Sequence, residues 1–486
     1  MFEVVKRLFS LYLGPLPVLV CAALLPVFRG RRLSGFLQET LMRFQPKILY
    51  AIQLYLILVQ SVNSVVVMNK PKQEDIRPNP VIMIPGDGGC QAFAELTNAP
   101  SSAFPIWVDL RYLITPGSFS KYFKLRFDPA TGRTYDNENV KVTFPGWGET
   151  WSVDNLDSRP HDATEYFGEI TRTLVSNNSF YQPNVTLRGT PFDFRKAPNE
   201  NEDFGPQLRR LIEETYTNGG NTRVVIVAHS MGTLYGLHFL KSQSIAWKKR
   251  YVKAFVATAG PLGGAVKALK IEASGDNFGI YFASSLWFRE LQRSMPSLAF
   301  LLPDPRLWPS DETLIFTPTK NYTAHDYEEF FNDIGFPEGF QMYMNSRDLV
   351  DVTSGPTGVD EVYCVHGLNV STAGAMVYAP PSTFVSPFPD QSPTLIFEDG
   401  DGTVNERSLA VCSRWKDVRY SVLPRADHLG IIRDPRFLQQ ILDITSARVY
   451  RQRHRNFIPW DELTPKKWSL PSLRAPPISA IPISVL

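Results

Sequence analysis

The sequence predicts an α/β fold built on a mostly parallel sheet, and three observations lead to this prediction. A β-branched run at 224–227 enters a short turn, AHSMG at 228–232, and a helical stretch follows at 233–240. An apolar strand at 80–84 runs into a glycine-rich loop. A further strand at 393–397 ends in acidic residues and glycines. Strands that turn sharply into helices, with loops at their carboxyl ends, are typical of α/β proteins.

The turn at 228–232 places a serine between small residues. Ser230 has Ala228 two positions before it and Gly232 two positions after it. A strand, a sharp turn at a serine and a helix form the nucleophile elbow of an α/β-hydrolase. The turn strains the serine backbone, and only small neighbours let the helix pack so close to the strand. Ala228 replaces the usual glycine, which is acceptable because only side-chain volume is constrained. Ser230 is therefore the candidate nucleophile.

A serine nucleophile needs a base and a carboxylate that orients the base, and in this fold the order is Ser, Asp, His. The acidic segment EDGDGTV at 398–404 offers Asp399 and Asp401, of which Asp401 is favoured. His428 follows in a strand-to-helix loop, whereas His454 lies in a basic run. We expect Asp401 and His428 to complete the triad and Asp399 to serve turn formation. An ordinary surface loop histidine is the alternative for His428.

The loop after the strand at 80–84 supplies the remaining part of such a site. An oxyanion hole takes one backbone N–H from the residue after the nucleophile, here Met231, and another from a loop after an early strand. Asp87 in this loop is the candidate for the second donor. The loop lacks the lysine and the spacing of a P-loop. A glycine turn without catalytic duty is the alternative.

These motifs belong to a longer pattern that runs from about residue 80 to about residue 450. The chain resembles the lecithin:cholesterol acyltransferase family, and within it the lysosomal phospholipase A2 group. The matching stretches are 84–87, 106–110, 145–148, 195–200, 228–232, 274–277, 317–323 and 400–405. The resemblance implies an α/β-hydrolase core with a cap domain and a small membrane-docking lid. It implies the same triad, and an oxyanion hole formed by the N–H groups of Asp87 and Met231.

The resemblance also implies an activity. It predicts a phospholipase A and O-acyltransferase that cleaves glycerophospholipid acyl esters through an acyl-serine intermediate and passes the acyl group to water or to a lipid alcohol such as ceramide. The alternative is a membrane-anchored phospholipid:sterol or phospholipid:diacylglycerol acyltransferase. A non-catalytic lipid-binding protein on this scaffold is a third possibility, against which the complete set of catalytic motifs argues. The chemistry needs no cofactor and no metal, and no Cys/His spacing suggests zinc.

Asp87 bears on the pH at which the reaction would run. The resemblance associates aspartate at this position with the lysosomal group, and cysteine with the plasma cholesterol-esterifying enzyme. A carboxylate beside a developing oxyanion repels it, whereas a protonated carboxyl does not. We therefore expect an acid optimum, although a histidine base must be neutral to accept a proton and opposes this trend.

The expected domains alternate along the chain. Residues 101–140 mix aromatic residues with lysines, as membrane-docking segments do, and Trp107, Leu113 and Phe119 are the candidate membrane or substrate contacts; a small satellite core is the alternative. The expected divisions are an apolar N-terminal region 1–64, core parts 65–100, 141–260 and 386–452, the lid 101–140, the cap 261–385 and a Pro-rich tail 453–486.

The chain has four cysteines. The resemblance implies a disulfide between Cys364 and Cys412, and two buried free thiols are the alternative. Cys21 and Cys90 have no evident partner. Mammalian members of the family carry a second disulfide near residues 107–130, where this chain has no cysteine. The lid geometry is therefore expected to differ from theirs.

The amino terminus predicts entry into the secretory pathway, with the lysosome lumen or the extracellular space as the destination. Residues 42–64, starting at Met42, have the pattern of a signal peptide. If translation starts at Met1, the apolar run 8–28 would be a signal anchor and the protein membrane-anchored. Glycosylation sequons support the secretory route; they lie at Asn177, Asn184, Asn321 and Asn369.

Charge and composition limit the expected partners. Lys and Arg number 50 and Asp and Glu 48, which gives a formal net charge of +2. This balance gives no argument for nucleic-acid binding. The expected partners are a phospholipid membrane surface and a lipid alcohol acceptor, and we expect a monomer.

Overall fold

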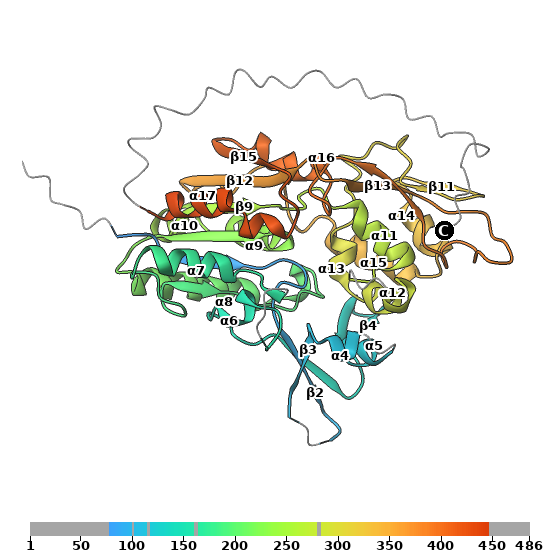
Figure 1. The fold of residues 1–486 in the computed structure, drawn as a ribbon, viewed down its shortest axis with the longest axis horizontal. Coiled ribbons are helices and arrows are strands. Elements are labelled where there is room, and N and C mark those ends of the chain that lie inside the picture. Colours follow the sequence, from blue (N-terminus) through green and yellow to red (C-terminus); the bar gives the residue numbers. More distant parts are fainter. Residues whose placement is uncertain (1–76, 100–101, 114–116, 160–163, 279–282, 447–486) are drawn as a thin grey trace, which may run out of the picture. The chain divides into compact units, whose positions relative to one another are not determined.

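The computed structural model describes residues 77–99, 102–113, 117–159, 164–278 and 283–446 (Figure 1). The predictions for the signal segment 1–64, for residues 65–76 of the core and for the tail 453–486 lie outside these residues, as does Cys21. Within the described ranges, no helix combines the length and the apolar character that crossing a membrane requires.

A six-stranded sheet forms the core, and every neighbouring pair in it is parallel. Its order is β15 (Val418–Pro424), β12 (Glu361–Leu368), β9 (Val252–Thr258), β8 (Val224–His229), β1 (Val81–Ile84) and β7 (Leu187–Gly189). All residues of β1 and β8 are buried, as strands covered on both faces must be. The predicted parallel α/β core is confirmed.

Helices of ordinary amphipathic pattern cover this sheet. In α8 the buried residues Leu208, Leu211, Ile212 and Thr215 recur at helical spacing, so one face packs on β8. The α17 helix begins with a proline, and the Asp434 side chain accepts a hydrogen bond from the backbone at its N-terminus. The helical elements of the core are α6 (Trp151–Asp154), α7 (Gly168–Asn177), η3 (Pro198–Glu200), α8 (Phe204–Asn218), α9 (Met231–Ser242), α10 (Ile245–Tyr251), α16 (Glu406–Leu409), η4 (Ala410–Arg414), η5 (Gly430–Arg433) and α17 (Pro435–Thr445).

The cap combines helices with a second, four-stranded sheet. Its helices are α11 (Val266–Ser274), α12 (Leu286–Arg293), α13 (Pro296–Phe300), α14 (Tyr327–Asp333) and α15 (Pro337–Ser346). The sheet has the order β11 (Asn321–Tyr322), β10 (Ile315–Phe316), β13 (Thr372–Val377) and β14 (Thr394–Glu398).

The expected division between core and cap is wrong at two strands. Strand β12 lies inside the expected cap 261–385, yet it pairs with β9 and β15 in the core sheet. Its central residues are continuously buried, as an inner parallel strand requires. Strand β14, which we expected in the core, pairs antiparallel with β13 at the edge of the cap sheet. Its residues keep partial exposure, which suits an edge strand.

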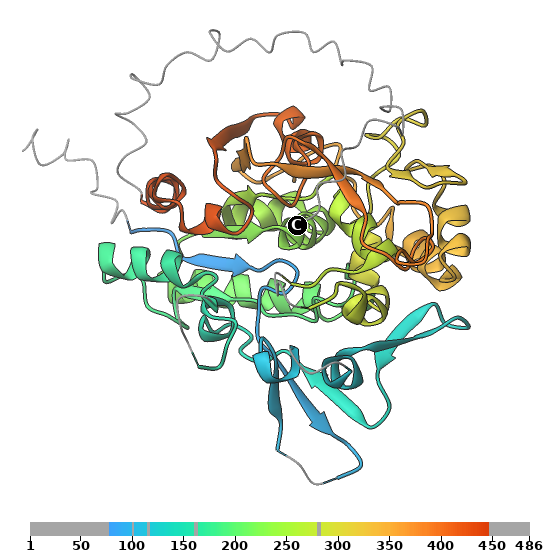
Figure 2. The ribbon, with the colours of Figure 1, turned by 45° about the vertical axis from the view of Figure 1, so that its right-hand side comes forward.

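The lid is a small unit of strands and short helices, drawn in blue and cyan in Figure 2. Strand β2 pairs with both β3 and β6, so the unit begins at Ala92, earlier than the expected 101. Its elements are β2 (Ala92–Leu96), β3 (Phe104–Trp107), α4 (Leu110–Leu113), α5 (Ser118–Phe123), β4 (Leu125–Asp128), β5 (Arg133–Asp136) and β6 (Val140–Thr143).

An aromatic cluster fills the lid. Phe119 and Phe123 are buried, and Trp107 stacks on both rings, with centroids 6.0 and 6.3 Å away. As a membrane contact, Phe119 is a wrong prediction, because its ring is 1% exposed and serves the lid core; its alternative role as a substrate contact stays a prediction. Trp107 is half-buried, and the side chain of Leu113 lies outside the described part of the structure.

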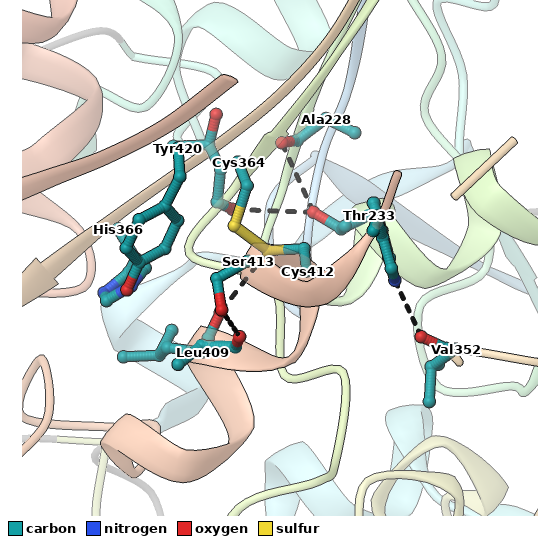
Figure 3. Close-up of a disulfide and its surroundings, with 12 residues drawn as sticks. Ala228, Thr233, Val352, Cys364, His366, Leu409, Cys412, Ser413 and Tyr420 are labelled. Atoms are coloured by element: carbon teal, nitrogen blue, oxygen red, sulfur yellow. Dashed lines mark hydrogen bonds between the residues drawn. A yellow bond between two sulfur atoms is a disulfide. The ribbon is translucent and has the colours of Figure 1, made fainter. Parts of the chain in front are cut away.

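The disulfide expected from the resemblance is present between Cys364 in β12 and Cys412 in η4, with their Cα atoms 5.9 Å apart (Figure 3). It joins a core strand to the segment that follows the acidic loop. Its surroundings include Ala228 and Thr233 of the elbow. Cys90 is a buried free thiol.

A buried arginine ties the lid to the core. The Arg195 guanidinium is 1% exposed and pairs at 2.8 Å with Asp193 next to it and with Asp136 at the end of β5. It also donates to the carbonyl of Phe123 and lies over the Phe123 and Phe144 rings. The lid thus gains a polar anchor in addition to its aromatic packing.

We expect Arg195→Met to lower the free energy of unfolding by about 3 kcal/mol, because Asp136 and Asp193 lose the charge that compensates their partial burial. Chemical denaturation measures the loss. The control is Arg306→Met: Arg306 also pairs with an aspartate, Asp304, but is 55% exposed, so it should cost at most about 1 kcal/mol. Equal losses in the two variants would contradict the anchor.

Candidate active site

The elbow has the strained geometry that its sequence indicates. Ser230 lies between β8 and α9 with φ 54° and ψ −131°. Residues other than glycine rarely adopt this combination of backbone angles. A Cβ on Gly232 would lie 2.3 Å from the Pro85 carbonyl oxygen. A Cβ on Gly86 would lie 2.6 Å from the Ser230 Cβ. Both glycines are therefore required by the close approach of the β1 loop to the elbow.

The structure brings the three expected triad residues together. His428 Nε2 lies 2.9 Å from Ser230 Oγ, and His428 Nδ1 lies 2.7 Å from Asp401 Oδ2. Ser230 follows β8, Asp401 follows β14 and His428 follows β15, so three separate segments meet at this point. A histidine placed between two such partners can accept a proton from the hydroxyl while the carboxylate stabilises the resulting charge.

Asp401 is fully buried and held as a carboxylate. Its Oδ1 accepts hydrogen bonds from the N–H groups of Val404, at 2.8 Å, and Thr403, at 3.1 Å. Burial alone would raise the pKa of Asp401. The charge and hydrogen bond of His428 and the two N–H groups outweigh burial, so that pKa lies below its ordinary value.

Asp399 has a different role. Its Oδ1 accepts from the N–H groups of Asn369 and Gly400, both at 2.7 Å. These bonds join the end of β12 to the turn that leads to Asp401. Asp401 contacts His428, whereas Asp399 contacts only backbone N–H groups of the turn, as the preference for Asp401 in the sequence analysis predicts.

The two candidate oxyanion donors lie on the two sides of the elbow. Met231 is the first residue of α9, so its N–H has no partner within the helix. Asp87 follows the end of β1, whose Ile84 is paired with Ala228. In the hydrogen bonds found between described residues, the Asp87 N–H has no acceptor.

The side chain of Asp87 is exposed to solvent, but neighbouring protein groups enclose part of its carboxyl. This enclosure raises the pKa of Asp87 to about 6, with the Lys267 charge and the Gly88 N–H acting in the opposite direction. The carboxyl is therefore neutral in acid and ionised above about pH 6.

Sequence reasoning missed two residues that touch this site, Tyr166 and His229. Both are buried, and they connect the Asp87 loop to the His428 loop through hydrogen bonds. A polar residue in an otherwise apolar strand was the available signal for His229; Tyr166 stands in no motif. As for metals, no group of three or more candidate ligands is found within the part of the chain that the structure describes.

Comparison with known proteins agrees with this geometry. The family described as lecithin:cholesterol acyltransferase matches residues 104–355 and 354–428. Lysosomal phospholipase A and acyltransferase from Mus musculus is 37% identical over 373 residues, which cover 73% of this chain and 88% of that protein. The Homo sapiens protein of the same name gives the same figures. Phosphatidylcholine-sterol acyltransferase from Mus musculus is 33% identical over 380 residues, which cover 74% and 84%.

Among solved structures, the Tle4–Tli4 complex aligns with a TM-score of 0.44 and 12% identity, covering 76% of this chain and 98% of that one. The relatives and the family match decide the classification. The residues matched by the family include the elbow, the acidic loop and His428. The chain belongs to the lecithin:cholesterol acyltransferase family.

Proposed function

We propose that this protein is a serine-dependent phospholipase A and O-acyltransferase, with Ser230, Asp401 and His428 as its triad. The hydrogen-bonded arrangement of these side chains at a strained elbow carries the proposal. The names of its relatives, at 37% and 33% identity, support acyl esters of phospholipids as the substrate class.

The proposed reaction has two halves. His428 Nε2 takes the proton of Ser230 as Oγ attacks the ester carbonyl carbon, and the N–H groups of Asp87 and Met231 donate to the oxyanion. The tetrahedral intermediate expels the glycerol oxygen, which takes the proton from His428, and an acyl-serine remains. Water or a lipid alcohol then attacks this ester with His428 as base, and Ser230 is regenerated. Asp401 orients His428 and stabilises its cation throughout.

The proposed setting is the lumen of the lysosome or the extracellular space, reached through the secretory pathway. Asn177, Asn184, Asn321 and Asn369 are all exposed, as glycosylation requires. A phospholipid membrane is the proposed partner surface. Trp287 of the cap and Leu429 beside the triad histidine, 47% and 50% exposed, are apolar residues available for it.

The test of the function uses the full-length secreted chain and phosphatidylcholine vesicles that contain a short-chain ceramide. When both products are followed from pH 4 to 8, we expect free fatty acid and acylated ceramide to form fastest at acid pH. Ser230→Ala should lower both rates by at least about a thousandfold. Activity found only near neutrality and only with sterol or diacylglycerol acceptors would favour the alternative acyltransferase; products that persist in Ser230→Ala would contradict the triad.

The two acids of the loop give a matched pair of variants. Asp401→Asn keeps the shape but loses the charge that fixes the histidine tautomer, so we expect kcat to fall by about ten-thousandfold. Asp399→Asn keeps an oxygen that can accept from Asn369 and Gly400, so activity should stay within about tenfold. Steady-state kinetics at one pH distinguishes them. The reverse ranking would assign the catalytic acid to Asp399.

Asp87→Asn tests the origin of the acid optimum. Above about pH 6 the wild-type carboxyl is ionised and opposes the oxyanion, so activity should fall as pH rises through this value. Asparagine stays neutral, so the alkaline limb of the profile of kcat against pH should move to higher pH. Asp87→Ala serves as the control for loss of the side chain. If Asp87→Asn shows the same profile of kcat against pH as the wild type, Asp87 is not the cause of the acid optimum.

A further inference from the structure

A buried chain of hydrogen bonds connects the oxyanion loop, the strand before the nucleophile and the loop of the triad histidine. The Gly86 N–H donates to the Tyr166 hydroxyl oxygen at 3.0 Å. That hydroxyl is in turn hydrogen-bonded to His229 Nδ1. At the other side of the ring, His229 Nε2 lies 2.8 Å from the backbone carbonyl oxygen of His428. Tyr166 is 3% and His229 0% exposed, so water does not compete for these groups.

The chemistry of the partners gives this chain one direction. The His428 carbonyl can only accept, so His229 Nε2 carries the proton. Nδ1 of the neutral ring then accepts from the Tyr166 hydroxyl, and the Tyr166 oxygen accepts from Gly86. A single tautomer therefore satisfies every donor and acceptor in the chain.

His229 and Tyr166 keep these protonation states at acid pH. Burial lowers the pKa of His229 to about 3; the neighbouring His428 acts in the same direction, while the hydrogen bond to the His428 carbonyl and the Asp401 carboxylate oppose it. Burial also raises the pKa of Tyr166 above its ordinary value. Neither group gains or loses a proton over the range in which the proposed reaction runs, so the geometry that they hold is constant.

The two ends of this hydrogen-bond chain lie on backbone groups next to the proposed oxyanion donor and at the proposed base. Gly86 directly precedes Asp87, and its backbone is held on both sides: its N–H, in the peptide that follows Pro85, donates to Tyr166, and its carbonyl, in the peptide that carries the Asp87 N–H, accepts from Gly89 at 3.1 Å. A glycine is conformationally free, so the bond to Tyr166 fixes the point from which this loop leaves β1. At the other end, the His428 main chain is held twice: its N–H donates to the Asp401 carbonyl at 2.8 Å, and its carbonyl accepts from His229. Oxyanion donors are effective only when they are placed within a fraction of an ångström.

We propose that Tyr166 and His229 are positioning residues, which set the Asp87 N–H and the His428 ring relative to Ser230 for acyl transfer. This inference rests on the proposed function. Neither side chain is hydrogen-bonded to Ser230 Oγ or to the His428 ring, although the His229 ring lies beside that ring with centroids 5.0 Å apart. Each acts through the backbone group to which it is bonded. Their loss should therefore lower kcat and leave KM nearly unchanged, since substrate contacts remain.

The first test is Tyr166→Phe in the full-length chain, which removes the hydroxyl and keeps the ring against Phe167 and His229. Hydrolysis of a soluble p-nitrophenyl ester is measured per active site titrated with a fluorophosphonate. We expect kcat to fall by about tenfold or more, less than the loss of a whole oxyanion donor, with KM within about twofold. Tyr327→Phe is the matched control: it also loses a buried hydrogen bond, to the Pro303 carbonyl in the cap, and should keep the wild-type kcat.

The second test separates the two bonds of His229. In His229→Gln the amide nitrogen can replace Nε2 as donor to His428, whereas in His229→Asn the amide oxygen can replace Nδ1 as acceptor from Tyr166. Each variant should keep more activity than His229→Leu, which keeps neither bond. In the double variant Tyr166→Phe/His229→Leu, the fold decrease in kcat should be smaller than the product of the two single decreases. The reason is that both changes break the same chain of hydrogen bonds.

Three results would overturn the proposal. The first is a kcat per titrated site within twofold of wild type in both Tyr166→Phe and His229→Leu, whatever their melting temperatures, since that leaves a purely structural role. The second is an equal fall in kcat in Tyr327→Phe. The third is a double variant that shows the full product of the single losses. A wild type that neither hydrolyses the ester nor reacts with the fluorophosphonate would instead overturn the proposed function, and this inference with it.

Discussion

The close approach of the β1 loop to the elbow is the constraint on which the rest of the site depends. Gly86 and Gly232 lie where any Cβ would collide with the opposite backbone or with Ser230. This contact lets the β1 loop, which carries the proposed donor Asp87, approach the elbow, and it requires β1 and β8 to be neighbours in register, as they are. The parallel sheet therefore serves the chemistry by aligning the carboxyl ends of two adjacent strands.

The parts of this arrangement that local sequence encodes can be predicted, and the parts that tertiary contacts encode cannot. The elbow, the acidic turn and the loop of His428 each carry their own turn chemistry, so the sequence alone identifies their residues. A short apolar run does not say which sheet it joins, so the domain divisions expected from sequence misplace β12 and β14. The prediction of Phe119 as a membrane contact fails because composition does not distinguish an exposed ring from one that packs on its neighbours.

Environment separates the ionisable groups of the site into distinct roles. His229 and Asp401 are both buried, yet the pKa of each is lowered for opposite reasons: burial disfavours the His229 cation, while His428 and two N–H groups favour the Asp401 anion. The pKa of Asp87 is raised to about 6 by its enclosure. In mild acid, the lowered pKa of Asp401 favours an anion where the histidine needs it, while the raised pKa of Asp87 favours a neutral carboxyl in the loop of the candidate oxyanion donor.

The lid and the oxyanion loop are one packed unit. The Trp107 indole N–H donates to the Gly88 carbonyl at 2.8 Å, and Gly88, with φ +66°, lies so close that a Cβ would come within 2.9 Å of that ring. Asp87 is thus held between Gly86, bonded to Tyr166, and Gly88, bonded to Trp107. Because Trp107 also packs on the buried aromatic residues of the lid, one side chain contacts both the lid core and the loop that carries the Asp87 N–H. The lid and the groups proposed to stabilise the oxyanion are therefore packed against each other, which the separate motifs of the sequence do not reveal.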